Sequence, residues 1–200
     1  MLKIGLTGNY CSGLDKVVLI LRKMGMLVFD ADLIIKFLIY NNTEVITKIK
    51  TQFGKIVFND NQVDISAFHT TEQFNNLMKL IEPELLKAYE KFRLVNRDSK
   101  FIFFKSQILF ETGLNTFMNI NVSVFKPNGN RVEDIQLINK LRTTEAWKIV
   151  DSEMDSFQKN RMCQYTIHNY DSHQDSLERQ IASILKALNN KVSEEKNHSY

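Results

Sequence analysis

The spacing of apolar residues predicts an α/β protein that opens with a strand, a turn and a helix. Residues 2–7 form a short apolar run that leads into the glycine-rich segment 8–13. Beyond it, apolar residues recur at helical offsets: Leu14, Val17, Val18, Leu21 and Met24. Gly25 stands where a glycine commonly ends a helix, and residues 27–29 read as a second strand. A strand–loop–helix–strand unit of this kind begins a parallel sheet.

Further along the chain, helical patterns alternate with short apolar runs. Helices are expected over 45–53, ending at Gly54, over 71–95, divided near Pro83, over 131–158, after a turn at 127–129, and over 177–188. The apolar runs 101–104, 121–125 and 164–168 predict buried strands. Residues 192–200 are expected to form a frayed tail.

Composition narrows the class of protein. The chain has 200 residues, of which 44% are hydrophobic and 24% charged, as in a single globular domain over 1–200. A net charge of +3, with acids and bases interspersed, does not suggest a nucleic-acid partner. Cys11 and Cys163 form no C-x-x-C pair and no disulfide framework. The four histidines lack ligand spacing, so no metal site built from His and Cys is expected.

The apolar stretch 33–40 is too short to cross a bilayer and contains Lys36, so no membrane association is expected. As a helix it would be apolar nearly all round, which predicts burial. It would lie in the inner core or, alternatively, in a contact with a partner or between copies of this chain. Polar residues interrupt the first nine positions, unlike a secretory leader. We therefore expect a protein of the reducing cytoplasm.

The glycine-rich segment has the form of a phosphate-binding loop, G-x-x-x-x-G-K-[ST], between a strand and a helix. In such a loop backbone N–H groups turn toward phosphate oxygens, and the helix N-terminus adds positive potential. The residues expected to bind nucleotide are Gly8, Asn9, Tyr10, Cys11, Ser12, Gly13, Leu14, Asp15 and Lys16.

Two positions depart from the loop pattern. Leu14 stands in place of the lysine, and Asp15 in place of the Ser or Thr that binds magnesium. Lys16 lies about 200° further round the helix than the missing lysine and does not simply replace it. Losing one such stabiliser of transition-state charge costs about 2.7–4 kcal/mol. Asp15 has two interpretations: it stabilises its helix through the dipole, or it fills the anion site and weakens nucleotide binding.

Segments in the same order along nearly the whole chain resemble the dephospho-CoA kinase family. They are I-G-L-T-G at 4–8, V-F-D-A-D at 28–32, Q-F-G at 52–54, I-L-F-E-T-G-L at 108–114, and finally Lys159, Tyr165, Ile167 and Asn169. The D-A-D corner and the 108–114 stretch are the most specific of these matches. Each match is weak alone, but their shared order makes the resemblance strong.

The resemblance implies a three-layer P-loop kinase-like fold with a five-stranded parallel sheet. A helical lobe at 60–95 would face coenzyme A, and a helical lid at 127–160 would close on ATP. The implied reaction is phosphorylation of the ribose 3′-hydroxyl of dephospho-CoA by ATP with Mg²⁺, in coenzyme A biosynthesis. Asp32 would accept the proton of the attacking hydroxyl, although Asp30 or Asp32 could instead cap the next helix. Substrate-binding candidates are Asp30, Glu82 and Glu111, and lid candidates are Arg131, Lys140 and Arg142.

Departures from the family pattern gather at positions that handle phosphate. Besides the loop, Lys105-Ser106-Gln107 replaces a D-x-P segment, and Glu82-Pro83 replaces a His-Pro pair. Two interpretations remain. In one, the chain is a divergent kinase in which Lys16 or a lid cation covers for the lost lysine. In the other, which the departures favour, it is a catalytically inactive homologue that binds a ligand or protein partner through the same scaffold.

Overall fold

The computed structural model describes residues 1–60, 62–68, 70–170 and 174–197. The chain forms two compact units, one comprising Met1–Phe29 with Asp98–Tyr200 and the other comprising Asp30–Arg97. The expected lobe at 60–95 falls inside the second unit, and the expected lid at 127–160 falls inside the first. None of the described helices is both long enough and apolar enough to span a bilayer.

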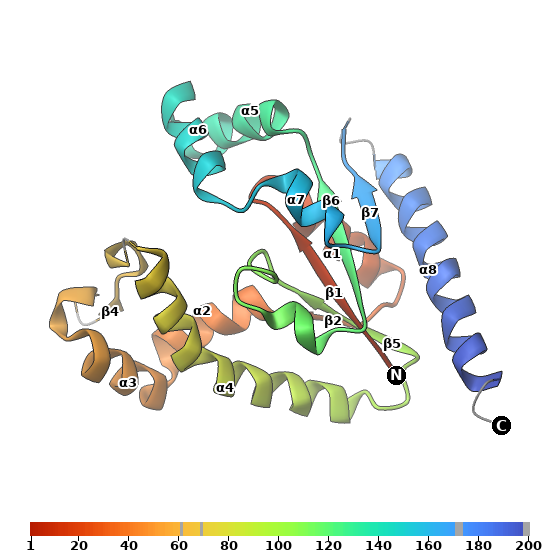
Figure 1. Cartoon of the computed structure of the whole chain (residues 1–200), viewed down its shortest axis with the longest axis horizontal. Helices are drawn as coiled ribbons and strands as arrows, with labels where there is room; N and C mark the ends of the chain where they lie inside the picture. Colours follow the sequence, from red (N-terminus) through yellow and green to blue (C-terminus); the bar gives the residue numbers. More distant parts are fainter. Residues whose placement is uncertain (61, 69, 171–173, 198–200) are drawn as a thin grey trace. The chain divides into compact units, whose positions relative to one another are not determined.

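A five-stranded sheet organises the first unit (Figure 1). Its spatial order is β2 (Val28–Asp30), β5 (Phe101–Lys105), β1 (Leu2–Gly8), β6 (Ile120–Phe125) and β7 (Tyr165–His168). The central strand β1 pairs in parallel with β5 on one side and with β6 on the other. Each of these strands lies on an apolar run expected from the sequence, and the five-stranded parallel α/β prediction is confirmed.

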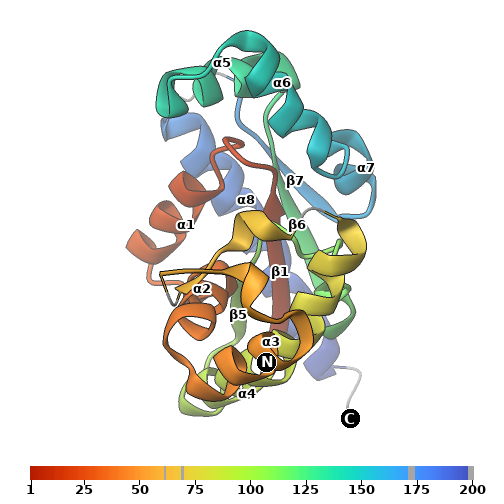
Figure 2. The same cartoon turned by 90° about the vertical axis from the view of Figure 1, so that its left-hand side faces the viewer.

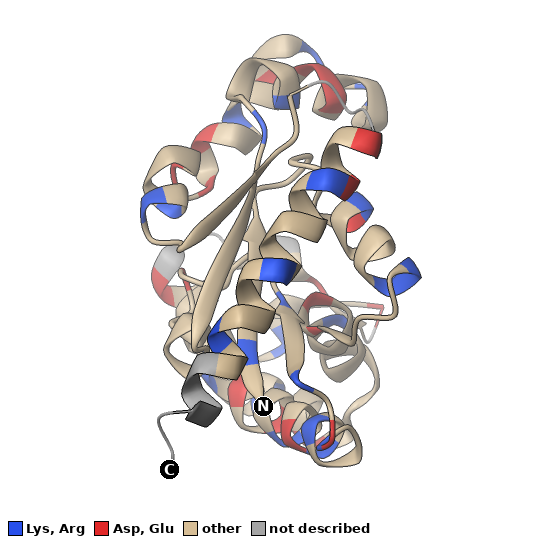
Figure 3. Ribbon diagram, turned by 90° about the vertical axis from the view of Figure 1, so that its right-hand side faces the viewer, with Lys and Arg blue, Asp and Glu red and all other residues tan. Residues whose placement is uncertain are grey.

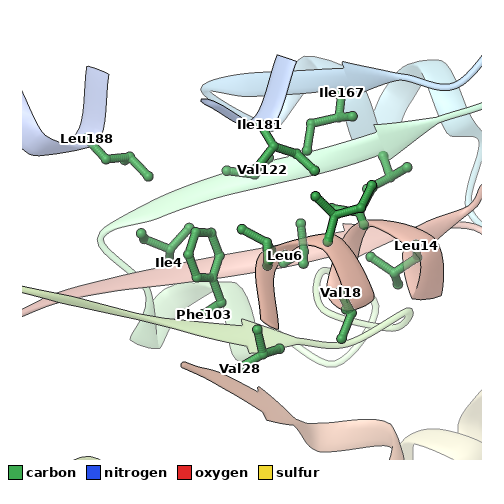
Figure 4. Close-up of a cluster of buried hydrophobic side chains, with 14 of the residues drawn as sticks. Ile4, Leu6, Leu14, Val18, Val28, Phe103, Val122, Ile167, Ile181 and Leu188 are labelled. Atoms are coloured by element: carbon green, nitrogen blue, oxygen red, sulfur yellow. The ribbon is translucent and has the colours of Figure 1, made fainter. Parts of the chain in front are cut away.

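One face of this sheet packs against α1 (Leu14–Lys23) and α8 (Gln174–Asn197). Figure 4 shows side chains of β1, α1 and α8 gathered in one cluster. The cluster includes Ile4, Leu6, Leu14, Val18, Val122, Ile167, Ile181 and Leu188. Alternation along β1 sends Ile4 and Leu6 to the same face, and the helical spacing in α1 and α8 turns their apolar stripes toward it. Both elements that the glycine-rich loop joins, β1 and α1, are therefore anchored in this core.

The segment 131–158 is helical, as expected, but it is not one continuous helix. It consists of α5 (Asn128–Asn139), α6 (Thr143–Ser152) and α7 (Ser156–Arg161), three separate helices in Figure 2. The expected turn at 127–129 is also wrong, because α5 begins at Asn128 with Pro127 as its N-cap. Proline is compatible with a helix start, where its missing N–H removes no helical bond.

At the other end, α8 continues to Asn197, so the segment expected to fray from residue 192 is helical up to that point. Residues 198–200 of that predicted tail lie outside the described residues. The predicted amphipathic pattern of α8 is present, since Leu177, Ile181 and Leu188 are all buried.

Acidic and basic residues are interspersed over the helices in Figure 3.

The second unit is largely helical. It contains α2 (Ala31–Asn41), α3 (Thr43–Phe53), the short antiparallel pair β3 (Phe58–Asn59) and β4 (Gln62–Val63), and α4 (Thr71–Val95). Two single 3₁₀ turns, Lys55–Val57 and Ile65–Ala67, connect them. Gly54 ends α3 with a positive φ of 74°, as the sequence pattern suggests.

Helix α4 is continuous through Pro83, so the predicted division there is wrong. A proline inside a helix costs about 3 kcal/mol, because it removes one backbone hydrogen bond and crowds the preceding turn. The apolar stripe runs unbroken across this position, with Leu77, Ile81 and Leu85 all buried. Burial of these side chains on both sides of Pro83 offsets the local cost.

The apolar stretch 33–40 forms most of α2. We expected this helix to be buried all round, and that expectation is wrong. Ile35, Leu38 and Ile39 are buried, whereas Leu33 and Phe37 are 60% and 58% exposed. An 11-residue helix packed mainly against α3 and α4 buries the side that faces those helices and leaves the opposite side open.

Candidate functional site

The loop between β1 and α1 needs its two flanking glycines for steric reasons. A Cβ on Gly8 would lie 2.5 Å from Ser12 Oγ and 2.8 Å from the Val124 carbonyl oxygen. Gly13 has a φ of 92°, and a Cβ there would lie 2.2 Å from Asn169 Nδ2. A side chain at Gly8 would therefore require a backbone shift at Val124, and one at Gly13 would strain the backbone at its positive φ and displace the Asn169 side chain. The glycine spacing read from the sequence therefore corresponds to a tightly closed turn at the end of the central strand.

Side chains from distant parts of the first unit hold this loop in place. Asn169, which follows β7, donates from Nδ2 to the Ser12 carbonyl at 2.9 Å. Asn9 donates from its side-chain amide to the Met154 carbonyl at 2.8 Å. The backbone N–H of Tyr10 donates to Glu153 Oε1 at 2.7 Å. One loop amide is thus already bonded to a carboxylate of the protein.

Arg131, one of the three lid candidates, is a buried anchor of the loop. Its side chain is 1% exposed, and its Nε donates to the Tyr10 carbonyl at 2.8 Å. The guanidinium also forms an ion pair with Glu153 and donates to Asn128 Oδ1. These contacts let Arg131 and Glu153 fix the first half of the loop together.

The other two lid candidates lie apart from the loop. Lys140 ends α5 and Arg142 precedes α6, and both are exposed. Within the described residues, neither side chain forms a hydrogen bond or ion pair with the loop. Sequence reasoning alone did not separate these two cations from Arg131, because all three lie in the same polar helical segment.

The two substituted loop positions differ sharply in their surroundings. Leu14 is 2% exposed and belongs to the core cluster in Figure 4. The Asp15 side chain is 81% exposed, and its Oδ1 lies 3.2 Å from Lys105 Nζ, whose side chain is only 7% exposed. Lys105 is the last residue of β5 and is in register with Leu6 of β1, which places it beside the loop. The sequence marked Lys105 as a departure but did not reveal this pairing.

A cavity of about 350 Å³ opens beside the loop. Loop residues between Asn9 and Lys16 line it together with Gln107, Lys126 and Asn169. Lys126, one residue past β6, is buried and forms an ion pair with Asp134, which also lines the cavity. Lys126 was missed by the sequence analysis, although its place at the carboxyl end of a predicted strand is where ligands bind in such sheets.

The residues around the loop do not suit a divalent cation. In P-loop enzymes the metal is held by the loop Ser or Thr hydroxyl and by an acid from a neighbouring strand. Here the loop position carries Asp15, and the neighbouring strand carries Lys105. A cation on Asp15 would lie against the like charge of that ammonium. Among the described residues, no group of three or more His, Cys, Asp or Glu side chains could hold a metal.

Glu111, a predicted substrate-binding residue, is engaged within the protein. Its Oε1 lies 2.8 Å from Nζ of Lys159, a buried side chain that also donates to the Gln107 carbonyl at 2.7 Å. This ion pair ties the segment 108–114 to α7 and orients the backbone that lines the cavity at Gln107.

The remaining predicted site residues belong to the second unit. Asp30 is the N-cap of α2, where its Oδ1 accepts a hydrogen bond from the Leu33 N–H at 3.2 Å. Asp32 lies in the first turn of the same helix, and Glu82 is half-buried on α4. The capping role suggested by the sequence is therefore present at Asp30, while the role of Asp32 stays a prediction.

Cys11 lies in the loop with a positive φ of 60°. Burial, followed by the negative charge of Asp134, raises the pKa of its thiol above the ordinary value. Cys11 is therefore a neutral thiol at neutral pH, and a nucleophilic role does not fit these surroundings.

The sheet order and the loop between β1 and α1 define a P-loop kinase-like fold. Structures of this class are similar to the chain over most of its length. A crystal structure from Thermus thermophilus covers 94% of this chain and 97% of its own, with a TM-score of 0.78 and 24% identity. A shikimate kinase from Bacteroides thetaiotaomicron shares the fold at a TM-score of 0.54 and 12% identity, covering 92% of this chain and 98% of its own.

The chain belongs to the dephospho-CoA kinase family, whose model matches residues 2–175. Dephospho-CoA kinase of Listeria innocua is 24% identical over 197 residues, covering 94% of this chain and 98% of the relative. Dephospho-CoA kinase of Fusobacterium nucleatum is 28% identical over 181 residues, covering 86% and 91% of the two chains. The expected family is confirmed, and with it a link to coenzyme A biosynthesis.

Proposed function

We propose that this chain binds nucleotide in the cavity beside its loop but transfers phosphate to dephospho-CoA much more slowly than an intact P-loop kinase does. The observation that carries the proposal is the burial of Leu14 in the core, at the position where the transferring phosphoryl group normally meets a lysine ammonium.

Nucleotide binding is supported by what the loop retains. The glycine-dependent turn, the helix N-terminus of α1 and the cavity of about 350 Å³ are all present. Buried lysines at positions 105 and 126 supply positive charge at the carboxyl ends of two strands that flank β1. In this part of the first unit, backbone N–H groups and lysine ammonium groups are therefore placed to bind a polyanion.

In the family reaction, the ribose 3′-hydroxyl oxygen attacks the γ-phosphorus of ATP while the bond to the bridging oxygen breaks and ADP leaves. Asp32 would take the hydroxyl proton. Without the loop lysine, the charge that develops on the phosphoryl oxygens has one stabiliser fewer. The expected loss is about 10²–10³ in rate.

The test measures ADP release with dephospho-CoA and magnesium-ATP for the unmodified chain and for Leu14→Lys/Asp15→Ser. We expect the double variant to be faster by about 10²–10³. Asp32→Asn in the double-variant background should remove that gain. Thermal unfolding of each protein checks that the buried lysine has not disrupted the core.

Two results would contradict the proposal. The first is an unmodified chain that turns over as fast as the double variant. The second is a folded double variant with no gain, which would favour the inactive homologue that serves as a binding module.

A further inference from the structure

Lys105 occupies an unusual place in the first unit. It is the last residue of β5, directly beside β1, and β1 continues into the glycine-rich loop. Its side chain is 7% exposed, so the lysine ammonium is largely buried. Burying an ammonium is costly unless an opposite charge accompanies it.

One opposite charge comes from the loop helix. Asp15, the second residue of α1, places Oδ1 3.2 Å from Lys105 Nζ, while its side chain is 81% exposed. The ion pair is therefore asymmetric, with the ammonium inside and the carboxylate toward solvent. Asp15 also lines the cavity beside the loop, so Lys105 Nζ lies 3.2 Å from a side chain of the cavity wall, although Lys105 is not itself a lining residue.

The polarity of this pair is reversed relative to a metal-binding P-loop. There, a neutral hydroxyl on the helix and an acid on the neighbouring strand hold a divalent cation against the phosphates. Here, the acid is on the helix and a cation is tethered to the strand. A lysine ammonium is a compact point charge, which makes it a closer match to a metal ion than a guanidinium would be.

From this reversal we infer that Lys105 takes the place of the divalent cation, so that a nucleoside di- or triphosphate binds beside the loop without a metal ion. The inference rests on the nucleotide binding proposed above. Asp15 positions the ammonium and partly neutralises it, which limits the affinity for the anion.

The test is calorimetric titration of the folded full chain with ADP, once with EDTA and once with excess Mg²⁺. We expect the two dissociation constants to agree within about threefold. Lys105→Met should weaken ADP binding about tenfold or more in both buffers, because a charged hydrogen-bond partner is lost. Lys23→Met, which removes an exposed lysine from the far end of α1, is the matched control and should leave binding unchanged.

Asp15→Asn provides a second variant that keeps the shape of the side chain, and thermal unfolding checks that the protein stays folded when the buried Lys105 ammonium loses this carboxylate. Removal of its negative charge should tighten ADP binding severalfold, again without a need for Mg²⁺. Weaker binding by this variant would contradict the role given to Lys105.

The inference is overturned if Mg²⁺ tightens ADP binding to the unmodified chain more than about tenfold, or if folded Lys105→Met binds ADP as well as the unmodified chain does. In either case nucleotide binding itself stands, and so does the proposed function. An absence of ADP binding in both buffers would overturn the inference and the proposed function together.

Discussion

Buried cations carry many of the polar contacts around the loop. Arg131 holds the Tyr10 carbonyl, Lys159 holds the Gln107 carbonyl, and each also pairs with a glutamate. Removing one member of such a pair leaves its partner without compensation, which costs far more than the loss of a surface ion pair. At this scale, single side chains therefore decide whether the loop keeps its shape.

Replacing Arg131 by methionine tests this dependence. The change leaves Glu153 and the Tyr10 carbonyl without their main partner, and we expect the free energy of unfolding in urea to fall by about 3–5 kcal/mol. Arg142→Met, at an exposed position of the same region, should change it by less than about 0.5 kcal/mol. Equal effects of the two substitutions would show that Arg131 does not anchor the loop.

Cys163 offers a prediction about pH. Burial raises the pKa of its thiol from 9.0 to about 11, against smaller opposing effects of Ser123 and Lys159. The folded protein thus keeps a proton that the unfolded chain loses, and the resulting stabilisation is complete below pH 9 and disappears as the pH rises through 11.

Iodoacetamide labelling of Cys163, followed by peptide mass spectrometry, measures this shift. The rate should keep rising about tenfold per pH unit between about pH 8 and 10, because the thiolate is the reacting species. Glutathione in the same buffers, an ordinary thiol, should level off near its own lower pKa. Levelling of the Cys163 rate at the same pH as glutathione would contradict a raised pKa.

At the scale of elements, the sequence predicted each strand of the main sheet, since buried parallel strands read as short apolar runs. It also located the loop, because two glycines at fixed spacing between a strand and a helix are a local pattern. Pro83 misled the prediction for α4, where packing across the proline outweighs local propensity. The pairing of Lys105 with Asp15 was not accessible, because it depends on β5 lying beside β1.

The steric requirement for a loop glycine can be tested by comparing its substitution with that of a glycine in a helix. Gly13→Ala introduces a Cβ at a φ of 92° and 2.2 Å from Asn169 Nδ2, so we expect a loss of about 1–3 kcal/mol in unfolding free energy. Gly129→Ala in α5 meets nothing within 4 Å and should gain about 0.4–1 kcal/mol, because alanine restricts the backbone of the unfolded chain. Thermal or urea unfolding checks both. A neutral Gly13→Ala would indicate that the loop relaxes without cost.

At the scale of the whole molecule, the two units are built differently. The first surrounds a central strand with partners on both sides, whereas in the described residues of the second a sheet is formed by the two-residue strands β3 and β4 alone, beside the helices α2, α3 and α4. An isolated two-stranded ribbon is marginally stable. Backbone protection should therefore differ strongly between the two sheets.

Native-state hydrogen exchange measures this difference. We expect amides of β1 to exchange at least about a hundredfold more slowly than those of β3 and β4. Both sets are followed in the same sample, so pH and temperature affect them alike. Comparable rates in the two sheets would show that β1 is not part of the most stable core.

The bond between Asn169 and Ser12 joins residues 157 positions apart. On the ribosome, at about 5–20 residues per second, Asn169 is added roughly 8–30 seconds after Ser12. Arg131 and Glu153, which hold the first half of the loop, also follow late. The glycine-rich turn is thus translated early but completed late, and a nascent chain that stalls before Asn169 carries an unfinished phosphate site.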